Sequence, residues 1–244
     1  MFESTEILII VVLLVVAILY SSVGHGGASG YLAVMAFLNV APNITKPTAL
    51  VLNLFVASIA TFQFYRRGYF DWKVFAPFAV ASVPMAFLGG VISLPTQIYR
   101  PLLGAVLLLA AIRLAWNFTS EKPIFVPSIW LALIIGAIIG FLSGLVGVGG
   151  GIFLTPVLLL TNWTETKKAA GISALFILVN SIAGLLGSYA QIGNLPANVW
   201  FWIGAAIVGG IIGSTLGSKY FNSLTLRRVL AFVLLIASFK MFFA

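Results

Sequence analysis

The chain has 244 residues, of which 61% are hydrophobic and only 7% are charged, with a net charge of +8. Soluble domains carry about a quarter charged residues, so this composition excludes a soluble protein and indicates one polytopic membrane domain. Cysteine is absent, which excludes disulfides, thiol catalysis and thiolate metal sites. The basic residues fall in expected loops and helix ends, where they orient the chain and meet anionic lipid, so no nucleic-acid partner is expected.

Two glycine-rich breaks interrupt long apolar runs. Residues 22–30 read Ser-Val-Gly-His-Gly-Gly-Ala-Ser-Gly, and residues 144–151 read Gly-Leu-Val-Gly-Val-Gly-Gly-Gly. A helix break inside a bilayer frees N–H and C=O groups, and these are tolerated only when buried in protein or facing a wet cavity. The breaks therefore predict a cavity near the middle of the membrane.

Three uninterrupted apolar segments follow each break. They cover residues 45–65, 74–93 and 98–116 in the first half and 166–187, 199–217 and 226–243 in the second. The two halves align at an offset of 123 to 127 residues, with weak identity in a consistent order. We therefore predict two repeats, residues 1–116 and 129–244, joined by a polar linker at 117–128.

The topology of each broken segment follows from its length and from the basic residues. Residues 7–40 are too long for one straight crossing of a core of about 30 Å and too short for two full spans. A re-entrant hairpin fits, and it places ten of the thirteen Lys and Arg residues on one face; a single tilted crossing divides them almost evenly. A short double crossing would also return the chain to its starting side of the membrane, and it remains an alternative to the re-entrant hairpin.

The expected fold is therefore an all-α polytopic membrane protein with two inverted-topology repeats. Each repeat is a broken or re-entrant helical hairpin followed by three transmembrane helices, and the odd number of crossings inverts the second repeat. Glycines spaced by four predict close helix packing inside the bundle, with a homodimer contact as the alternative. These glycines are Gly136, Gly140 and Gly144, and Gly209, Gly213 and Gly217.

The breaks are also the candidate binding site. A short helix is expected to begin near Ala28 and another near Ile152, and free N–H groups at two such N-termini favour an anion. The alternative is that the glycines only allow close helix crossing. The candidate substrate-binding residues are Ser22, Gly24, His25, Gly26, Gly27, Ser29, Gly147, Gly149, Gly150, Gly151 and Thr155 at the breaks, and Asn53, Ser173 and Asn180 in the spans.

His25 is the only histidine and lies in the first break. Its pKa range suits a proton-coupling role, while a space-filling histidine bonded to a freed carbonyl is the alternative. The five carboxylates all fall in expected termini or loops, which argues against an enzyme needing an acid/base pair and against a carboxylate cation site. No GxGxxG spacing and no GK[ST] occur, so we expect no nucleotide, cofactor, metal or catalytic residue.

The segment Gly147-Val148-Gly149-Gly150-Gly151 followed by Thr155-Pro156 resembles the TauE/SafE family of sulfite exporters. The stretch from Lys168 to Ser173 and the loop containing Gly193 resemble it too. The first break departs from the plain glycine run at His25, Ala28 and Ser29.

This resemblance implies a multi-pass inner-membrane transporter that exports sulfite or a related organosulfonate by alternating access. The alternatives are a transporter for another small anion such as a carboxylate, a passive anion channel, and an assembly subunit without transport.

Overall fold

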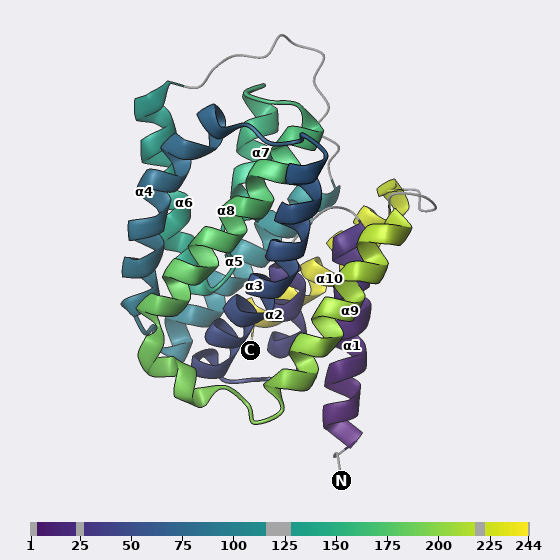
Figure 1. Ribbon diagram of the computed structural model, residues 1–244. Helices are drawn as coiled ribbons and strands as arrows, with labels where there is room; N and C mark the ends of the chain where they lie inside the picture. Colours follow the sequence, from purple (N-terminus) through teal and green to yellow (C-terminus); the bar gives the residue numbers. More distant parts are fainter. Residues whose placement is uncertain (1–3, 23–26, 116–127, 218–222, 244) are drawn as a thin grey trace.

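The computed structural model describes residues 4–22, 27–115, 128–217 and 223–243 (Figure 1). All regular structure in these ranges is helical, with ten α-helices and one 3-10 helix. The first half contains α1 (Ser4–Ser22), α2 (Ala28–Phe37), α3 (Pro42–Arg66), α4 (Trp72–Val91) and α5 (Thr96–Ala115). The second contains α6 (Ile129–Val146), α7 (Gly151–Leu160), α8 (Thr166–Gly187), η1 (Tyr189–Asn194), α9 (Val199–Gly217) and α10 (Ser223–Phe243).

Five helices in the described ranges are long and apolar enough to cross a membrane: α3, α4, α5, α6 and α8. Shorter apolar stretches fall in α1, α2, α7, α9 and α10. The helix ends lie within a few residues of those expected from the apolar runs, so the all-helical polytopic prediction is confirmed. The expected linker at 117–128 falls almost wholly outside the described residues.

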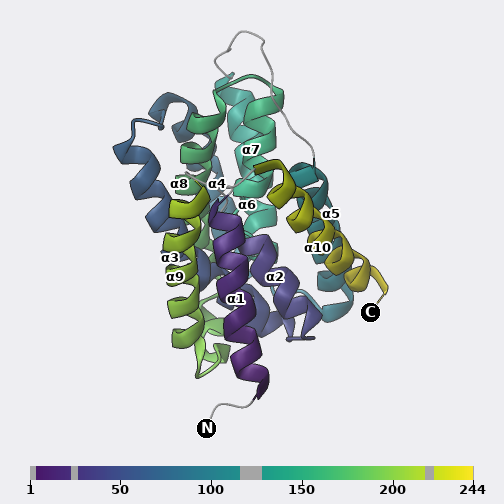
Figure 2. The same cartoon turned by 90° about the vertical axis from the view of Figure 1, so that its right-hand side faces the viewer.

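The helices α2 and α7 are each ten residues long, about 15 Å at 1.5 Å per residue, which is half the thickness of a bilayer core. Each turns back along the helix that precedes it (Figure 2). The end of α2 lies beside the start of α1, because Phe37 and Leu8 line the same groove. Trp163, just after α7, contacts Phe78 at the level where Gly136 of α6 packs. Both breaks therefore produce helical hairpins.

Glycine allows two pairs of helices to pack with their backbones almost in contact. A Cβ atom at Gly136, Gly140 or Gly144 of α6 would lie 2.5, 2.2 or 1.9 Å from a carbonyl oxygen of α4. At Gly209 and Gly213 of α9 it would lie 2.7 and 2.2 Å from carbonyl oxygens of α1. The predicted packing within the bundle is confirmed at these five positions; the structure places Gly217 at the end of α9.

The remaining long helices pack across the two halves, α3 against α8 and α5 against α10. The buried apolar side chains form two clusters, one centred on α1, α2, α5, α9 and α10 and one on α4, α6, α7 and α8. Helix α2 belongs to the first cluster, and Leu154, Leu158 and Leu159 of α7 belong to the second. Ile152 in the first turn of α7 packs in the first cluster, and there the first turns of the two helices meet.

Candidate functional site

Glycines in the left-handed region form the start of both half-length helices. Gly27 precedes α2 with φ 74° and ψ −12°, and Gly150 precedes α7 with φ 81° and ψ −19°. Gly147 and Gly149 of the second break also have positive φ, at 91° and 79°. An L-residue with a side chain adopts this conformation at a cost of about 1–2 kcal/mol. The glycine runs therefore let the chain leave one helix and enter the next within a few residues.

Two asparagines end these helices in the same way. Asn39 after α2 and Asn162 after α7 both have φ 54°. The N–H of Val40 donates to Met35 O over 2.9 Å, and the N–H of Trp163 donates to Leu158 O over 3.0 Å. This six-to-one bond beside a left-handed residue is the Schellman cap. Neither cap was predicted from the sequence, although asparagine is the residue besides glycine that most readily adopts this conformation.

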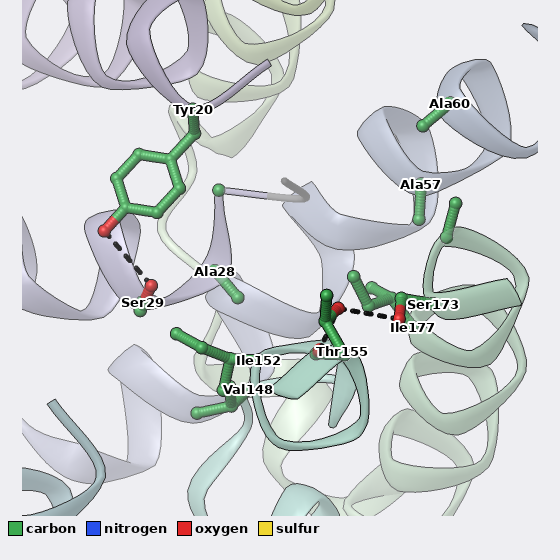
Figure 3. Close-up of a pocket in the computed structure, with 13 residues that line it drawn as sticks. Tyr20, Ala28, Ser29, Ala57, Ala60, Val148, Ile152, Thr155, Ser173 and Ile177 are labelled. Carbon is green, nitrogen blue, oxygen red and sulfur yellow. Dashed lines mark hydrogen bonds between the residues drawn. The ribbon is translucent and has the colours of Figure 1, made fainter. Parts of the chain in front are cut away.

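A buried cavity of about 30 Å³ lies where the first turns of α2 and α7 meet (Figure 3). This volume holds about two water molecules. The first N–H groups of both helices have no partner within their helix and give that end a partial positive charge. The lining residues are Tyr20, Gly27, Ala28, Ser29, Ala57, Ala60, Val148, Gly151, Ile152, Thr155, Ser173, Ala174 and Ile177. None of these described residues is charged.

Hydroxyl groups supply the polar side chains of the cavity. On one side, the Ser29 hydroxyl donates to Tyr20 Oη over 3.1 Å, which leaves the Tyr20 proton available for a ligand. On the other side, Thr155 Oγ1 donates to Gly151 O over 2.9 Å and lies 2.7 Å from Ser173 Oγ. Tyr20 was missed in the sequence analysis, where a tyrosine beside the break inside an apolar run was the available signal.

Two buried side chains bind the carbonyl groups freed by the second break. Tyr99 Oη donates to Val146 O over 3.0 Å, and Asn53 Nδ2 donates to Val148 O over 3.2 Å. Both come from the first half of the chain, so the break in the second half is completed by α3 and α5. This arrangement meets the requirement that freed backbone groups in a membrane find partners inside the protein.

The candidate residues therefore separate into four groups. The structure places Gly27, Ser29, Gly151, Thr155 and Ser173 in the cavity wall. It places Gly147, Gly149 and Gly150 in the second break and Asn53 behind that break, while Asn180 Nδ2 donates to Phe176 O of its own helix over 2.8 Å. Gly24, His25, Gly26 and the side chain of Ser22 lie outside the described residues.

Lys46 is a further buried polar residue near the second break. Its Nζ donates to the carbonyl oxygens of Gly89, Gly90 and Ile92 at 3.3, 2.8 and 3.1 Å. These carbonyls belong to the end of α4, where a helix lacks partners and carries partial negative charge. Lys46 does not line the cavity, and its ammonium group connects α3 to α4.

Comparison with known proteins identifies the family. The sequence model of the sulfite exporter TauE/SafE family matches residues 8–241. The chain belongs to this family. TauE/SafE proteins are membrane transporters and not enzymes, so the chain is a multi-pass membrane transporter.

Two relatives match nearly the whole chain. A "Probable membrane transporter protein y4hK" of Sinorhizobium fredii is 40% identical over 232 residues, covering 93% of this chain and 94% of the relative. A "Probable membrane transporter protein YjnA" of Bacillus subtilis is 26% identical over 254 residues, covering 96% and 98%. No solved structure matches the chain.

Proposed function

We propose that this TauE/SafE protein is a secondary transporter that exports sulfite or a small organosulfonate across the inner membrane by alternating access. The observation that carries the proposal is the single cavity lined by the N-terminal turns of both α2 and α7. Each helix N-terminus is equivalent to about half a positive charge, so the two together offset about one negative charge. The Tyr20 hydroxyl, which accepts from Ser29 and keeps its own proton, adds a donor suited to an oxyanion.

The proposed mechanism depends on an inverted repeat, residues 1–116 and 129–244, which matched positions support. Gly27 and Gly150, and Asn39 and Asn162, are each 123 residues apart and share their backbone conformations. A Cβ at Gly213 would meet Ile18 O at 2.2 Å, and one at Gly89 would meet Phe141 O at 2.3 Å. Ile18 and Phe141 are 123 residues apart in the sequence, and Gly89 and Gly213 are 124 residues apart. The contact of Gly213 with Ile18 is therefore equivalent to the contact of Gly89 with Phe141, with the two halves of the chain exchanged.

The helix pairs support the same relation. If each helix of α1–α5 is exchanged with its counterpart in α6–α10, the contact between α1 and α9 becomes the contact between α6 and α4. The contacts between α3 and α8 and between α5 and α10 stay the same. In transporters built from inverted repeats, one repeat rocks against the other about a site near the midplane. Export of an anion is favoured by an inside-negative potential, by about 2.3 kcal/mol per charge per 100 mV.

Counterflow in reconstituted vesicles tests the proposal. Vesicles loaded with unlabelled sulfite or a small sulfonate should accumulate the labelled anion transiently, and the rate should saturate. Flux that neither saturates nor shows exchange would identify a channel, and counterflow of a carboxylate alone would identify another substrate class. Absence of flux for every anion would contradict transport.

A matched pair of threonine variants tests the site. In Thr155→Val the shape is kept, but the hydroxyl facing Ser173 is lost, so we expect roughly tenfold weaker sulfite binding. Thr161, the C-cap residue of the same helix, makes the equivalent bond to Val157 O at an exposed position outside the cavity, so Thr161→Val should leave binding unchanged. Equal effects of the two variants would remove the cavity from the proposal.

A further inference from the structure

Basic residues mark one face of the helical bundle. Helix α3 ends and α4 and α8 begin at this basic face, which carries the exposed side chains of Arg66, Arg67, Lys73 and Lys167. Lys167 Nζ donates there to Tyr69 Oη over 3.3 Å, so the end of α3 and the start of α8 lie together. The opposite face therefore contains the start of α3 and the ends of α4 and α8.

The central cavity lies closer to the basic face than to the opposite face. In α3, the lining residue Ala60 is about 9 Å from the last residue of the helix, whereas Ala57 is about 22 Å from the first. In α8, Ser173 is about 10 Å from the first residue of the helix, and Ile177 is about 15 Å from the last. A thicker layer of protein therefore separates the cavity from the opposite face.

Backbone contact between α4 and α8 closes that opposite face. A Cβ atom at Gly90 would lie 2.4 Å from Gly184 O, and one at Gly187 would lie 2.2 Å from Phe87 O. Leu50 of α3 is fully buried beside this contact, with its Cδ1 atom 3.5 Å from the position of a Cβ at Gly184. The three helices therefore leave no space for a substrate at this level.

Two polar connections hold α4 in this position. Lys46 of α3 is 3% exposed, and its Nζ donates to three carbonyl oxygens at the end of α4. Beyond the helix ends, Gln191 Nε2 donates to Ser93 Oγ over 2.7 Å and joins η1 to the segment after α4. At this face α4 therefore cannot move away from α3 and α8 without breaking both connections.

The equivalent interface at the basic face, between α9 and α3, is looser. The offset of 124 that relates the helix contacts of the inverted repeat also relates Gly184 to Ala60. Gly184 packs against the backbone of α4, whereas Ala60 is partly exposed and lines the cavity. A Cβ atom at Gly210 of α9 would still lie 3.8 Å from the nearest atom of α3, in the side chain of Val56. Equivalent interfaces of the two halves therefore differ in closeness.

We propose that this structure is the state of the transporter that opens to the basic face, and that the contact of α4 with α8 is its closed gate. This inference rests on the transport proposed above. In the other state the halves exchange roles, so that α4 separates from α8 and α9 closes onto α3 at Ala60. The contact between α3 and α8 is the same in both states, because these helices are each other's counterparts. Lys46 stabilises the state open to the basic face.

Cysteine reactivity at the equivalent positions Ala60 and Gly184 tests which gate is closed, because the chain has no cysteine of its own. In detergent both faces meet the solvent. A charged methanethiosulfonate should modify Ala60→Cys at least roughly tenfold faster than Gly184→Cys, since the latter reacts only in a minor state. Both variants should react fully after unfolding in sodium dodecyl sulfate. Equal rates, or faster modification of Gly184→Cys, would overturn the proposal.

Lys46→Gln tests the role of the lysine, because it removes the ammonium group at the end of α4. In this background the rate should rise for Gly184→Cys and fall for Ala60→Cys. The ratio of the two rates should change roughly tenfold, as expected for loss of one hydrogen bond to a charged group. General loosening of the bundle would raise both rates together. A parallel change, or no change, would therefore exclude Lys46 as the group that holds the gate.

A crosslink connects the gate to transport. Joining Ser93→Cys and Gln191→Cys with a short bifunctional methanethiosulfonate should abolish sulfite counterflow and keep sulfite binding, and a reducing agent should restore counterflow. Tyr69→Cys with Lys167→Cys is the matched control at the basic face, and its crosslink should leave counterflow intact. Counterflow through a crosslinked gate, or its loss in both crosslinked proteins, would overturn the gate. Absence of counterflow before crosslinking would contradict transport alone, and the cysteine rates would still identify the state.

Discussion

At the residue scale, Gly149 shows why the second break requires glycine. Its φ of 79° is one that side chains disfavour, and a Cβ there would lie 2.8 Å from Asn53 Nδ2 and 2.9 Å from Ser181 Oγ. Asn53 also binds the adjacent carbonyl of Val148. Glycine is therefore required at position 149 both for its positive φ and because a Cβ atom would not fit. Both requirements apply immediately before α7 begins.

We predict that Gly149→Val abolishes sulfite counterflow and destabilises the protein by at least about 2 kcal/mol. The left-handed conformation and the overpacking each contribute about 1–2 kcal/mol. Gly204→Val is the matched control, because Gly204 is exposed in α9 and has nothing within 4 Å of a Cβ. Thermal unfolding in detergent and vesicle counterflow measure the two effects. Normal transport by a folded Gly149→Val protein would exclude the break from the binding site.

At the scale of elements, close approach of helix backbones determines which helices pair. Gly144 of α6 lies against Ala86 O of α4, whereas Gly184 of α8 lies opposite Gly144 with more room. A Cβ at Gly144 would be 1.9 Å from that oxygen, and a Cβ at Gly184 would be 3.4 Å from its nearest neighbour. The two glycines lie in adjacent helices but have different roles. Only Gly144 is needed for the close approach of its helix to a neighbour, since Gly184 leaves room for a Cβ atom.

We predict opposite effects for alanine at these two positions. Gly144→Ala must push α6 away from α4, so we expect destabilisation of about 1–3 kcal/mol or loss of folded protein. Gly184→Ala fits at ordinary contact distance and gains up to about 1 kcal/mol from the better helix propensity of alanine. Melting temperatures in the same detergent compare the two, and a Gly144→Ala protein as stable as Gly184→Ala would show that the backbones are not in contact there.

At the scale of the whole molecule, an inverted repeat requires equivalent turns to lie on opposite sides of the membrane. The turn between α3 and α4 contains Arg67, and the connection between α8 and α9 contains Gly193; both residues are exposed. Because the chain has no cysteine, single-cysteine variants can be labelled without background.

We predict that Arg67→Cys and Gly193→Cys react with a membrane-impermeant maleimide from opposite sides. Arg67→Cys should be labelled from the cytoplasmic side, where basic residues accumulate, and Gly193→Cys from the other side. Labelling after permeabilisation controls for burial, since both variants should then react fully. Reaction of both from one side would rule out the inverted arrangement and the alternating-access mechanism based on it.

The sequence by itself determined the elements of this protein and the places where they break. Helix positions follow from runs of apolar residues long enough for a bilayer, and the starts of α2 and α7 follow from the glycine runs before them. These are local properties, since a few neighbouring residues decide backbone conformation and hydrophobic length. The caps at Asn39 and Asn162 are local as well, and were missed because asparagine is less specific for this conformation than glycine.

Only the tertiary structure decided which side chains complete the candidate site. It placed Asn53 at the carbonyl of Val148, 95 residues away in the chain, and it brought Tyr20 to the cavity beside the start of α2. It also directed Lys46 to the end of α4. These contacts join residues on different helices, and their partners depend on how the helices rotate and cross, which the spacing of residues along one helix does not specify.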